Sequence, residues 1–298
     1  MNNIHTKVIM NVNYSKYIYI LFLIQSCTLN FSVLISFQNN HHNIDQNHTI
    51  TVYVHGTYPM KKLLQYTPFR RLTYCPQGLS LIQNMPKKYH FYKMASHMID
   101  LEPLWYNWKR FYIFGWKSEK VYDYVRVNAA QDLVDGLRKI VDNYYQEHHI
   151  LPSIKLIGFS HGGNVVLHTA QFLPICVDGQ DVKVQVWLFG TPVQQINKHL
   201  VNSSYFLQVY SFYSTKDWLQ RMDPQGIWDK TIDKKFFWSD RMFNDNDRCV
   251  QVNFTVNNKS ISHSYYRSIF KYFPLIEKEV LASSSDINSG MITINLVL

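Results

Sequence analysis

Short apolar runs alternate with amphipathic segments along the chain from about residue 49 onward. Nearly continuous apolar runs predict strands at 49–54, 110–114, 154–159, 182–189, 206–213 and 249–256. Apolar residues at helical spacing predict helices at 128–145, 161–173, 194–201 and 264–281. Apolar strands separated by helices indicate a parallel sheet that is covered on both faces. The predicted fold class is therefore α/β, with a mostly parallel central sheet and helices on both faces.

Two segments interrupt this alternation and are longer than an ordinary connection between a strand and a helix. Residues 58–109 are rich in aromatic side chains and partly helical in pattern, which predicts a helical cap-like insertion. Residues 218–248 have a loop-like composition with Trp218, Trp228 and Trp238. Insertions at the rim of an α/β sheet often shape a binding site. We expect one domain over 41–285 that carries both insertions, followed by a C-terminal tail at 286–298.

The first forty residues differ in kind from the rest. Lys7 and Lys16 precede the apolar block 17–24, which is typical of a secretory signal and is too short to span a bilayer alone. With the second apolar run at 31–37, it would make a signal anchor. Cys27 ends a degenerate lipobox, which would make it a lipidated N-terminus, and a cytosolic protein with an apolar N-terminal strand is the alternative. We expect residues 1–40 to be a signal peptide or N-terminal membrane anchor, and the protein to be exported or membrane-associated.

Composition and charge narrow the classes of function. Apolar residues make up 46% of the chain, enough for a sizeable core, and the formal net charge is +9. The basic residues are scattered, which favours weak attraction to an anionic membrane surface over a nucleic-acid site. The sequence has no zinc-like Cys/His spacing, Walker loop or G-x-G-x-x-G, so no metal, cofactor or nucleic-acid partner is expected. Besides Cys27 the chain has Cys75, Cys176 and Cys249, and their spacing selects no disulfide.

The strongest chemical signal is the stretch Gly158-Phe159-Ser160-His161-Gly162 between a predicted strand and a predicted helix. Such a sharp turn strains the backbone of the central serine, and small neighbours allow the strand and helix to approach closely. Because ligands bind at the carboxyl ends of parallel strands, Ser160 is placed where a nucleophile would be useful. An ordinary turn is the alternative interpretation.

A serine hydroxyl is a weak nucleophile that needs a base, oriented by an acid. His263 follows the last long strand, on a loop that returns to the carboxyl edge of the sheet, and is the predicted base. His55, His161 and His168 are weaker candidates, because they lie in a structural turn, beside the serine, and inside a helix.

Asp217 is the predicted acid because it comes just beyond the strand at 206–213. Its rivals, Asp223, Asp229 and Asp233, sit deeper in the insertion.

These pieces resemble the α/β-hydrolase superfamily, particularly its lipase and esterase branch, over residues 49–281. The matching segments are 54–57, 158–162, 188–192, 213–217 and His263, and the serine, acid and histidine occur in the family's order. The resemblance implies an oxyanion hole made by the backbone N–H groups of Thr57 and His161. The chain departs from the family in lacking its first two strands, unless residues 31–37 supply one.

The leading hypothesis is a serine hydrolase that cleaves carboxylic esters, of lipids or acyl chains, through Ser160, His263 and Asp217. Trp105, Tyr106, Trp108 and Phe111 would then suit an acyl-binding wall. Because the same triad also serves amidases and thioesterases, the sequence does not separate these activities. A catalytically inactive, membrane-tethered binding protein on a hydrolase scaffold is the alternative from another class.

Overall fold

The computed structural model describes residues 44–57, 71, 74–120, 122–222, 242–244, 247–285, 287 and 289–298. The predicted signal or anchor at 1–40, Cys27, and the apolar run at 31–37 therefore lie outside the described residues. So do Trp228 and Trp238 and the three rival aspartates Asp223, Asp229 and Asp233.

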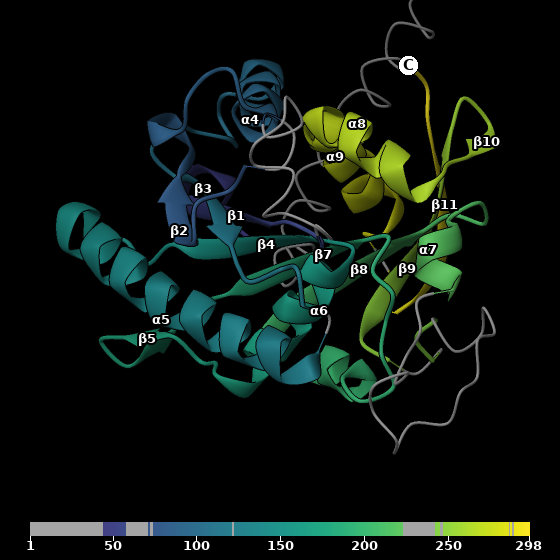
Figure 1. Ribbon diagram of the computed structural model, residues 1–298. Coiled ribbons are helices and arrows are strands. Elements are labelled where there is room, and N and C mark those ends of the chain that lie inside the picture. Colours follow the sequence, from purple (N-terminus) through teal and green to yellow (C-terminus); the bar gives the residue numbers. More distant parts are fainter. Residues whose placement is uncertain are drawn as a thin grey trace, which may run out of the picture. The chain divides into compact units, whose positions relative to one another are not determined.

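A mostly parallel sheet forms the centre of the described chain (Figure 1). Its strands, in spatial order, are β10 (Lys259–Ser260), β9 (Cys249–Val256), β8 (Phe206–Tyr213), β7 (Val184–Phe189), β4 (Ser153–Phe159), β1 (Thr49–Val54), β3 (Phe111–Gly115) and β2 (Gly78–Leu81), and β11 (Gly290–Leu296) pairs with β9. The long neighbouring strands pair in parallel, whereas β2 and β10 are antiparallel to their partners. A separate hairpin joins β5 (Cys176–Val177) to β6 (Gln180–Asp181).

The central strands form because nearly every side chain in them can be buried. All residues of β1, β4 and β7 are buried, as expected for parallel strands covered on both faces. Alternate residues of β4 show this arrangement directly, because Leu156 points into one apolar core and Ile157 into the other. The sheet therefore separates two cores.

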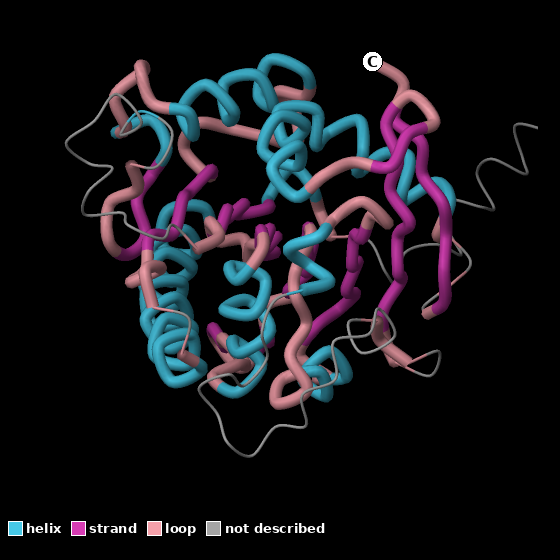
Figure 2. The backbone as a smooth tube through the Cα atoms, turned by 45° about the vertical axis from the view of Figure 1, so that its right-hand side comes forward, coloured by secondary structure: helices cyan, strands magenta, loops and turns pink. Residues whose placement is uncertain are grey.

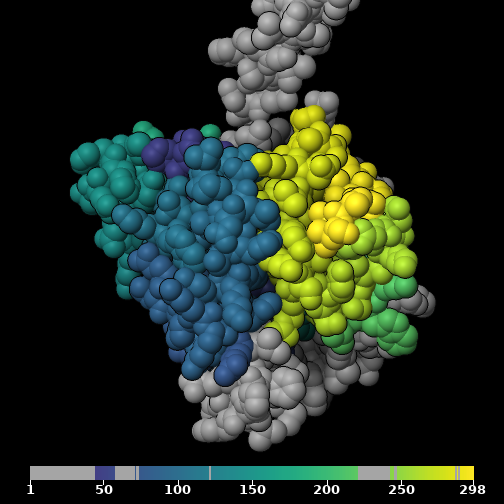
Figure 3. Space-filling view, turned by 90° about the horizontal axis from the view of Figure 1, so that it is seen from above, coloured from purple at the N-terminus to yellow at the C-terminus, as the bar shows by residue number. Residues whose placement is uncertain are grey.

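Helices cover both faces of the sheet, as Figures 1 and 2 show. On one face lie α5 (Asp123–His148) and α6 (His161–His168), which is followed by the 3-10 turn η3 (Thr169–Gln171). On the other face lie α4 (His90–Leu101), α8 (Tyr266–Ile269), η7 (Phe270–Tyr272) and α9 (Phe273–Ser283). In the space-filling view α4 and the C-terminal helices lie side by side (Figure 3), and α4 packs against η7 and α9.

The predicted fold class is confirmed: the protein is α/β, with a mostly parallel sheet between two helical layers. The predicted insertion at 58–109 contributes the helix α4 and also a strand, β2, which was not predicted. Within the segment predicted as a tail, 286–298, residues 290–296 form β11 and pair in register with β9. Ile294 and Leu296 are buried there, so this segment adds apolar surface to the core.

Two of the four residues of the predicted acyl-binding wall, Tyr106 and Phe111, lie in the core. Phe111 is fully buried at the start of β3, and Tyr106 is buried against the N-terminal part of β4. The Tyr106 hydroxyl donates a hydrogen bond to Glu277 in α9, and Lys155 Nζ lies 2.5 Å from Glu277 Oε1. This buried polar cluster lies at the amino end of the strands, opposite the predicted nucleophile. These aromatic residues are core residues.

Candidate active site

Ser160 occupies a strained turn between β4 and α6. Its backbone has φ 53° and ψ −132°, a region that costs a residue with a side chain about 1–3 kcal/mol. The turn is held by two backbone hydrogen bonds, from Ser160 N–H to Phe189 O at 2.9 Å and from Gly163 N–H to Ser160 O at 2.9 Å. A Cβ atom on Gly158 would lie 2.5 Å from Gly163 Cα, so the strand and helix touch here. The surrounding structure thus fixes Ser160 in a conformation found at nucleophile turns.

Asp217 and His263 form a hydrogen-bonded pair at the same edge of the sheet. Nδ1 of His263 lies 2.9 Å from Oδ2 and 3.0 Å from Oδ1 of the carboxylate. The Asp217 side chain is fully buried and that of His263 is 11% exposed. Because a carboxylate only accepts, Nδ1 donates to Asp217, which leaves Nε2 as the ring nitrogen available for proton transfer. The pair therefore has the protonation pattern of an acid-oriented base.

Several hydrogen bonds hold this pair in place. The backbone N–H of Gln220 donates to Asp217 Oδ1 at 2.8 Å, which fixes the carboxylate from its second side. Two further contacts join the end of β8 to the segment before His263. The Ile261 N–H donates to Ser214 Oγ at 2.8 Å, and the hydroxyls of Thr215 and Ser260 lie 2.7 Å apart. The loops that carry the acid and the base are therefore fastened to each other.

The pair is linked to the serine turn through Phe159. The Phe159 ring stacks on the His263 imidazole with centroids 4.9 Å apart and planes 28° apart. Ser160, the next residue, is 9% exposed. The fold thus brings the three predicted residues Ser160, Asp217 and His263 to one edge of the sheet, although the described hydrogen bonds of His263 run to Asp217 alone. Catalytic hydrogen bonds to a nucleophile often form only when substrate is bound.

The two predicted oxyanion donors, Thr57 and His161, flank the serine. His161 is the first residue of α6 and directly follows Ser160. On the other side, a Cβ atom on Gly56 would lie 2.8 Å from Ser160 Cβ, so the backbone just before Thr57 passes against the serine. Backbone N–H groups at a helix start are suited to a developing negative charge.

Two other candidate histidines, His55 and His168, contact groups that lie outside the Asp217–His263 pair. His55 is fully buried between the rings of Phe91 and Trp116, and its Nδ1 lies 2.6 Å from Gly56 O. His168 is 2% exposed, and its Nε2 lies 3.0 Å from Asp123 Oδ1. Each ring thus contacts groups other than the Asp217–His263 pair.

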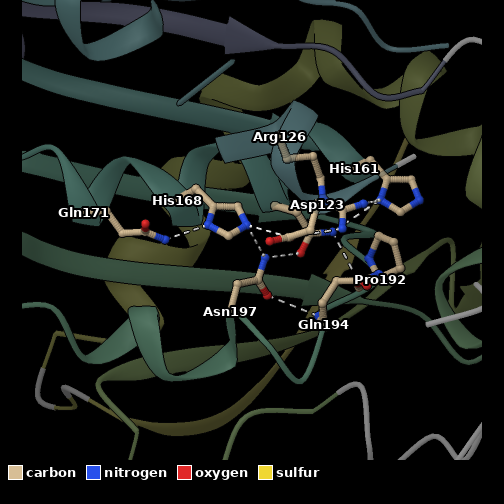
Figure 4. A network of polar contacts seen from close by, with 9 residues as sticks. Asp123, Arg126, His161, His168, Gln171, Pro192, Gln194 and Asn197 are labelled. Atoms are coloured by element: carbon tan, nitrogen blue, oxygen red, sulfur yellow. Dashed lines mark hydrogen bonds and ion pairs between the residues drawn. The ribbon is translucent and has the colours of Figure 1, made fainter. Parts of the chain in front are cut away.

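A second polar cluster, which the sequence analysis missed, lies buried beside the serine turn (Figure 4). It contains Asp123 and Arg126 from the first turns of α5, and three residues of α6 at spacings of three and four. Those residues are His161, Asn164 and His168. Burial raises the pKa of Asp123, but its hydrogen bond with His168 and its electrostatic attraction to His168 and Arg126 outweigh burial and hold that pKa below its usual value. The sequence signal for this cluster is the spacing of His161, Asn164 and His168 at i, i+3 and i+7, which places three polar residues on one face of α6.

The described residues offer no metal site and no disulfide. No group of three or more His, Cys, Asp or Glu side chains is placed to hold a metal ion in this part of the chain. Cys176, which is exposed, and Cys249, which is buried, are free thiols. Among the helices that the structure describes, none has the length and apolar character needed to cross a bilayer.

Comparison with known proteins found similarities to solved structures, but not to family models or curated proteins. No family model matches the chain, and no curated protein matches it. One similar structure is a lipase-esterase related protein from Clostridium acetobutylicum, with 12% identity and a TM-score of 0.28, covering 86% of this chain and 88% of that one. Another is MenH from S. aureus, with 14% identity and a TM-score of 0.27, covering 86% and 87%. Both TM-scores are too low to support an assignment of family or function.

Proposed function

We propose that the protein is a serine hydrolase that cleaves carboxylic esters. The observation that carries this proposal is the Asp217–His263 hydrogen bond at the edge of the sheet where Ser160 is held in a strained turn. A buried carboxylate that orients an imidazole, with a serine at the same edge of the sheet, is the arrangement that turns a hydroxyl into a nucleophile.

The reaction follows from these positions. Ser160 Oγ attacks the ester carbonyl carbon while His263 Nε2 takes the hydroxyl proton. The resulting oxyanion accepts hydrogen bonds from Thr57 N–H and His161 N–H, each worth about 3 kcal/mol of barrier. Collapse expels the alcohol, which receives the proton from His263 and leaves an acyl group on Ser160. Water, deprotonated by His263, then hydrolyses this acyl-enzyme.

The rim of the site favours an apolar acyl group. Trp218 and Leu219, next to Asp217, are 72% and 62% exposed, and Tyr265, close to His263, is 41% exposed. These residues belong to α7 (Trp218–Met222) and η6 (His263–Tyr265), which contact each other. Exposed apolar side chains gathered at a site are typical of a surface that meets apolar ligands. We therefore propose lipid or acyl esters as the substrate class.

The net charge of +9 supports a further part of the proposal, a weak attraction to anionic membrane surfaces. With the apolar N-terminal pattern, this favours an exported or membrane-associated protein. An amidase or thioesterase with the same triad remains the second enzyme hypothesis, because the described side chains around Ser160 do not distinguish the leaving group.

Hydrolysis of a matched substrate series tests the proposal. The series comprises p-nitrophenyl esters from acetate to long acyl chains, with an anilide and a thioester of the best acyl group. We expect kcat/KM to rise from acetate to medium or long chains and to be highest for the oxygen ester. A preference for acetate would replace the lipid substrate by a small ester. A preference for the anilide or thioester would select the second enzyme hypothesis.

A further inference from the structure

The cluster beside the serine turn contains an unusual contact between a buried arginine and His161. Arg126 is 3% exposed, and its Nη1 lies 3.4 Å from His161 Nδ1. The Asn164 side-chain amide points at the same ring nitrogen, also from 3.4 Å. Two donors from two helices thus converge on one atom of the residue that follows the proposed nucleophile. Figure 4 shows Arg126 beside His161.

These contacts determine the protonation pattern of the His161 ring. A guanidinium group and the amide nitrogen of asparagine only donate hydrogen bonds. Nδ1 of His161 must therefore accept, so the imidazole is neutral and carries its proton on Nε2. Because both donors are buried, turning the ring would leave their N–H groups without this acceptor.

Arg126 is itself held in position. Its Nη2 lies 3.2 Å from Asp123 Oδ1, and His168 Nε2 lies 3.0 Å from the same oxygen. Gln171 Nε2 lies 2.8 Å from His168 Nδ1 and continues the chain of contacts. The result is a line of polar groups from the end of α6 through the start of α5 to His161.

Asn164 is fixed from the opposite side of the cluster. Its amide also donates to Pro192 O at 3.1 Å, and its oxygen accepts from Asn197 Nδ2 at 2.9 Å. The segment that follows β7 is thereby attached to the same face of α6.

We propose that Arg126 is a positioning residue for the oxyanion hole. This inference rests on the proposed function, in which the His161 N–H stabilises the oxyanion. By fixing the His161 ring, Arg126 fixes the first residue of α6 and so the direction of its backbone N–H. A misplacement of about 1 Å in a catalytic group can cost about 10²-fold in rate, so a contact that fixes the side chain of the donor residue affects the reaction.

A double-mutant cycle tests the inference. Arg126→Met removes the contact, and His161→Ala removes the ring while it keeps the backbone N–H. We expect each single variant to lower kcat about 10- to 100-fold with little change in KM, in the range seen when supporting residues of a site are removed. The double variant should lose no more than the larger single loss, because both changes remove the same interaction. Losses that multiply, or an unchanged kcat in Arg126→Met, would overturn the inference.

Two further variants distinguish a loss of positioning from a loss of folding. Arg138→Met is the matched control, because Arg138 forms the same i, i+3 pair with Asp135 on α5, at 2.7 Å, but with both side chains exposed. It should leave kcat unchanged. Arg126→Lys keeps the charge and one donor, and we expect it to recover part of the activity lost in Arg126→Met.

A measurement that needs no activity separates this inference from the proposed function. Nitrogen-15 NMR of the parent, with the His161 signals identified by their absence in His161→Ala, should show Nδ1 unprotonated and Nε2 protonated. A protonated Nδ1 would overturn the role of Arg126 whether or not the protein hydrolyses esters. An inactive parent with the expected ring state would instead contradict the proposed function.

Discussion

Gly190 lies directly against the carboxylate of Asp217. Gly190 has φ +54°, a conformation that residues with a side chain rarely adopt, and a Cβ atom there would lie 2.8 Å from Asp217 Oδ2. The same atom would lie 2.9 Å from the ring of Tyr266. The end of β7 thus provides the space in which the acid faces His263.

Gly190→Ala should therefore lower the catalytic rate strongly and the free energy of unfolding only moderately. The left-handed conformation costs alanine about 1–2 kcal/mol, and displacement of the carboxylate should lower kcat about 100-fold. Ester hydrolysis and denaturant unfolding measure the two effects. Gly179→Ala is the control, since Gly179 has φ +76° but nothing within 4 Å of an added Cβ. It should lose similar stability and no activity; equal activities of the two variants would contradict this account of Gly190.

The exposed rim next to Asp217 should contribute to lipid binding. We expect the chain lacking residues 1–37 to bind anionic vesicles weakly, and less at high salt, because salt screens the attraction of its basic residues. Leu219→Ser should weaken vesicle binding and reduce the preference for long acyl chains, because it removes apolar surface from the rim. Leu104→Ser is the matched control, with 69% exposure against 62% for Leu219, in the loop before β3. Equal effects of the two variants, or no vesicle binding by the truncated chain, would contradict the interfacial role.

The buried Lys155–Glu277 pair should stabilise the packing of α9 on β4. Both side chains are fully buried, and Lys155 also contacts Gln46 and Tyr106. Glu277→Leu leaves the lysine charge without its partner, which typically costs about 3–5 kcal/mol. The double variant Lys155→Met/Glu277→Leu should be more stable than Glu277→Leu alone, because it removes both charges. Urea unfolding of the three proteins checks this order, and a double variant less stable than the single one would contradict it.

His90 should make the protein sensitive to mild acid. Burial, with the nearby charges of Arg267 and Lys93, lowers the pKa of His90 from 6.5 to about 4. Between these values the unfolded chain binds a proton that the folded protein does not, so stability falls as the pH drops from 6.5 to 4, by about 3 kcal/mol. His90→Gln should show a smaller loss over this window. A constant difference in unfolding free energy between parent and variant from pH 7 to 4 would contradict the lowered pKa.

The central strands could be predicted from sequence because both of their faces are buried. β1, β8 and β9 have the predicted bounds, since strands buried on both faces are mostly apolar. The C-terminal helix predicted at 264–281 is instead divided into η6, α8, η7 and α9. Apolar spacing does not separate one long helix from several short turns that bury the same face.

Edge strands and buried polar contacts were not predictable in the same way. β2 and β11 are short or half-exposed, and each is defined by the strand it pairs with, which local patterns do not contain. The turn around Ser160 has a sequence signature because glycine is needed where backbones touch. The contact of Arg126 with His161 joins two helices, so the spacing of residues along either helix does not predict it.

Covalent labelling shows most directly whether Ser160 is an activated nucleophile. A fluorophosphonate probe reacts with a serine that is activated by a neighbouring base, and peptide mass spectrometry identifies the modified residue. We expect labelling of the folded parent at Ser160, no labelling of Ser160→Ala, and strongly reduced labelling of His263→Ala. Folded parent protein that resists the probe, or that is labelled at another serine, would contradict the proposed hydrolase and favour a binding protein on the same scaffold.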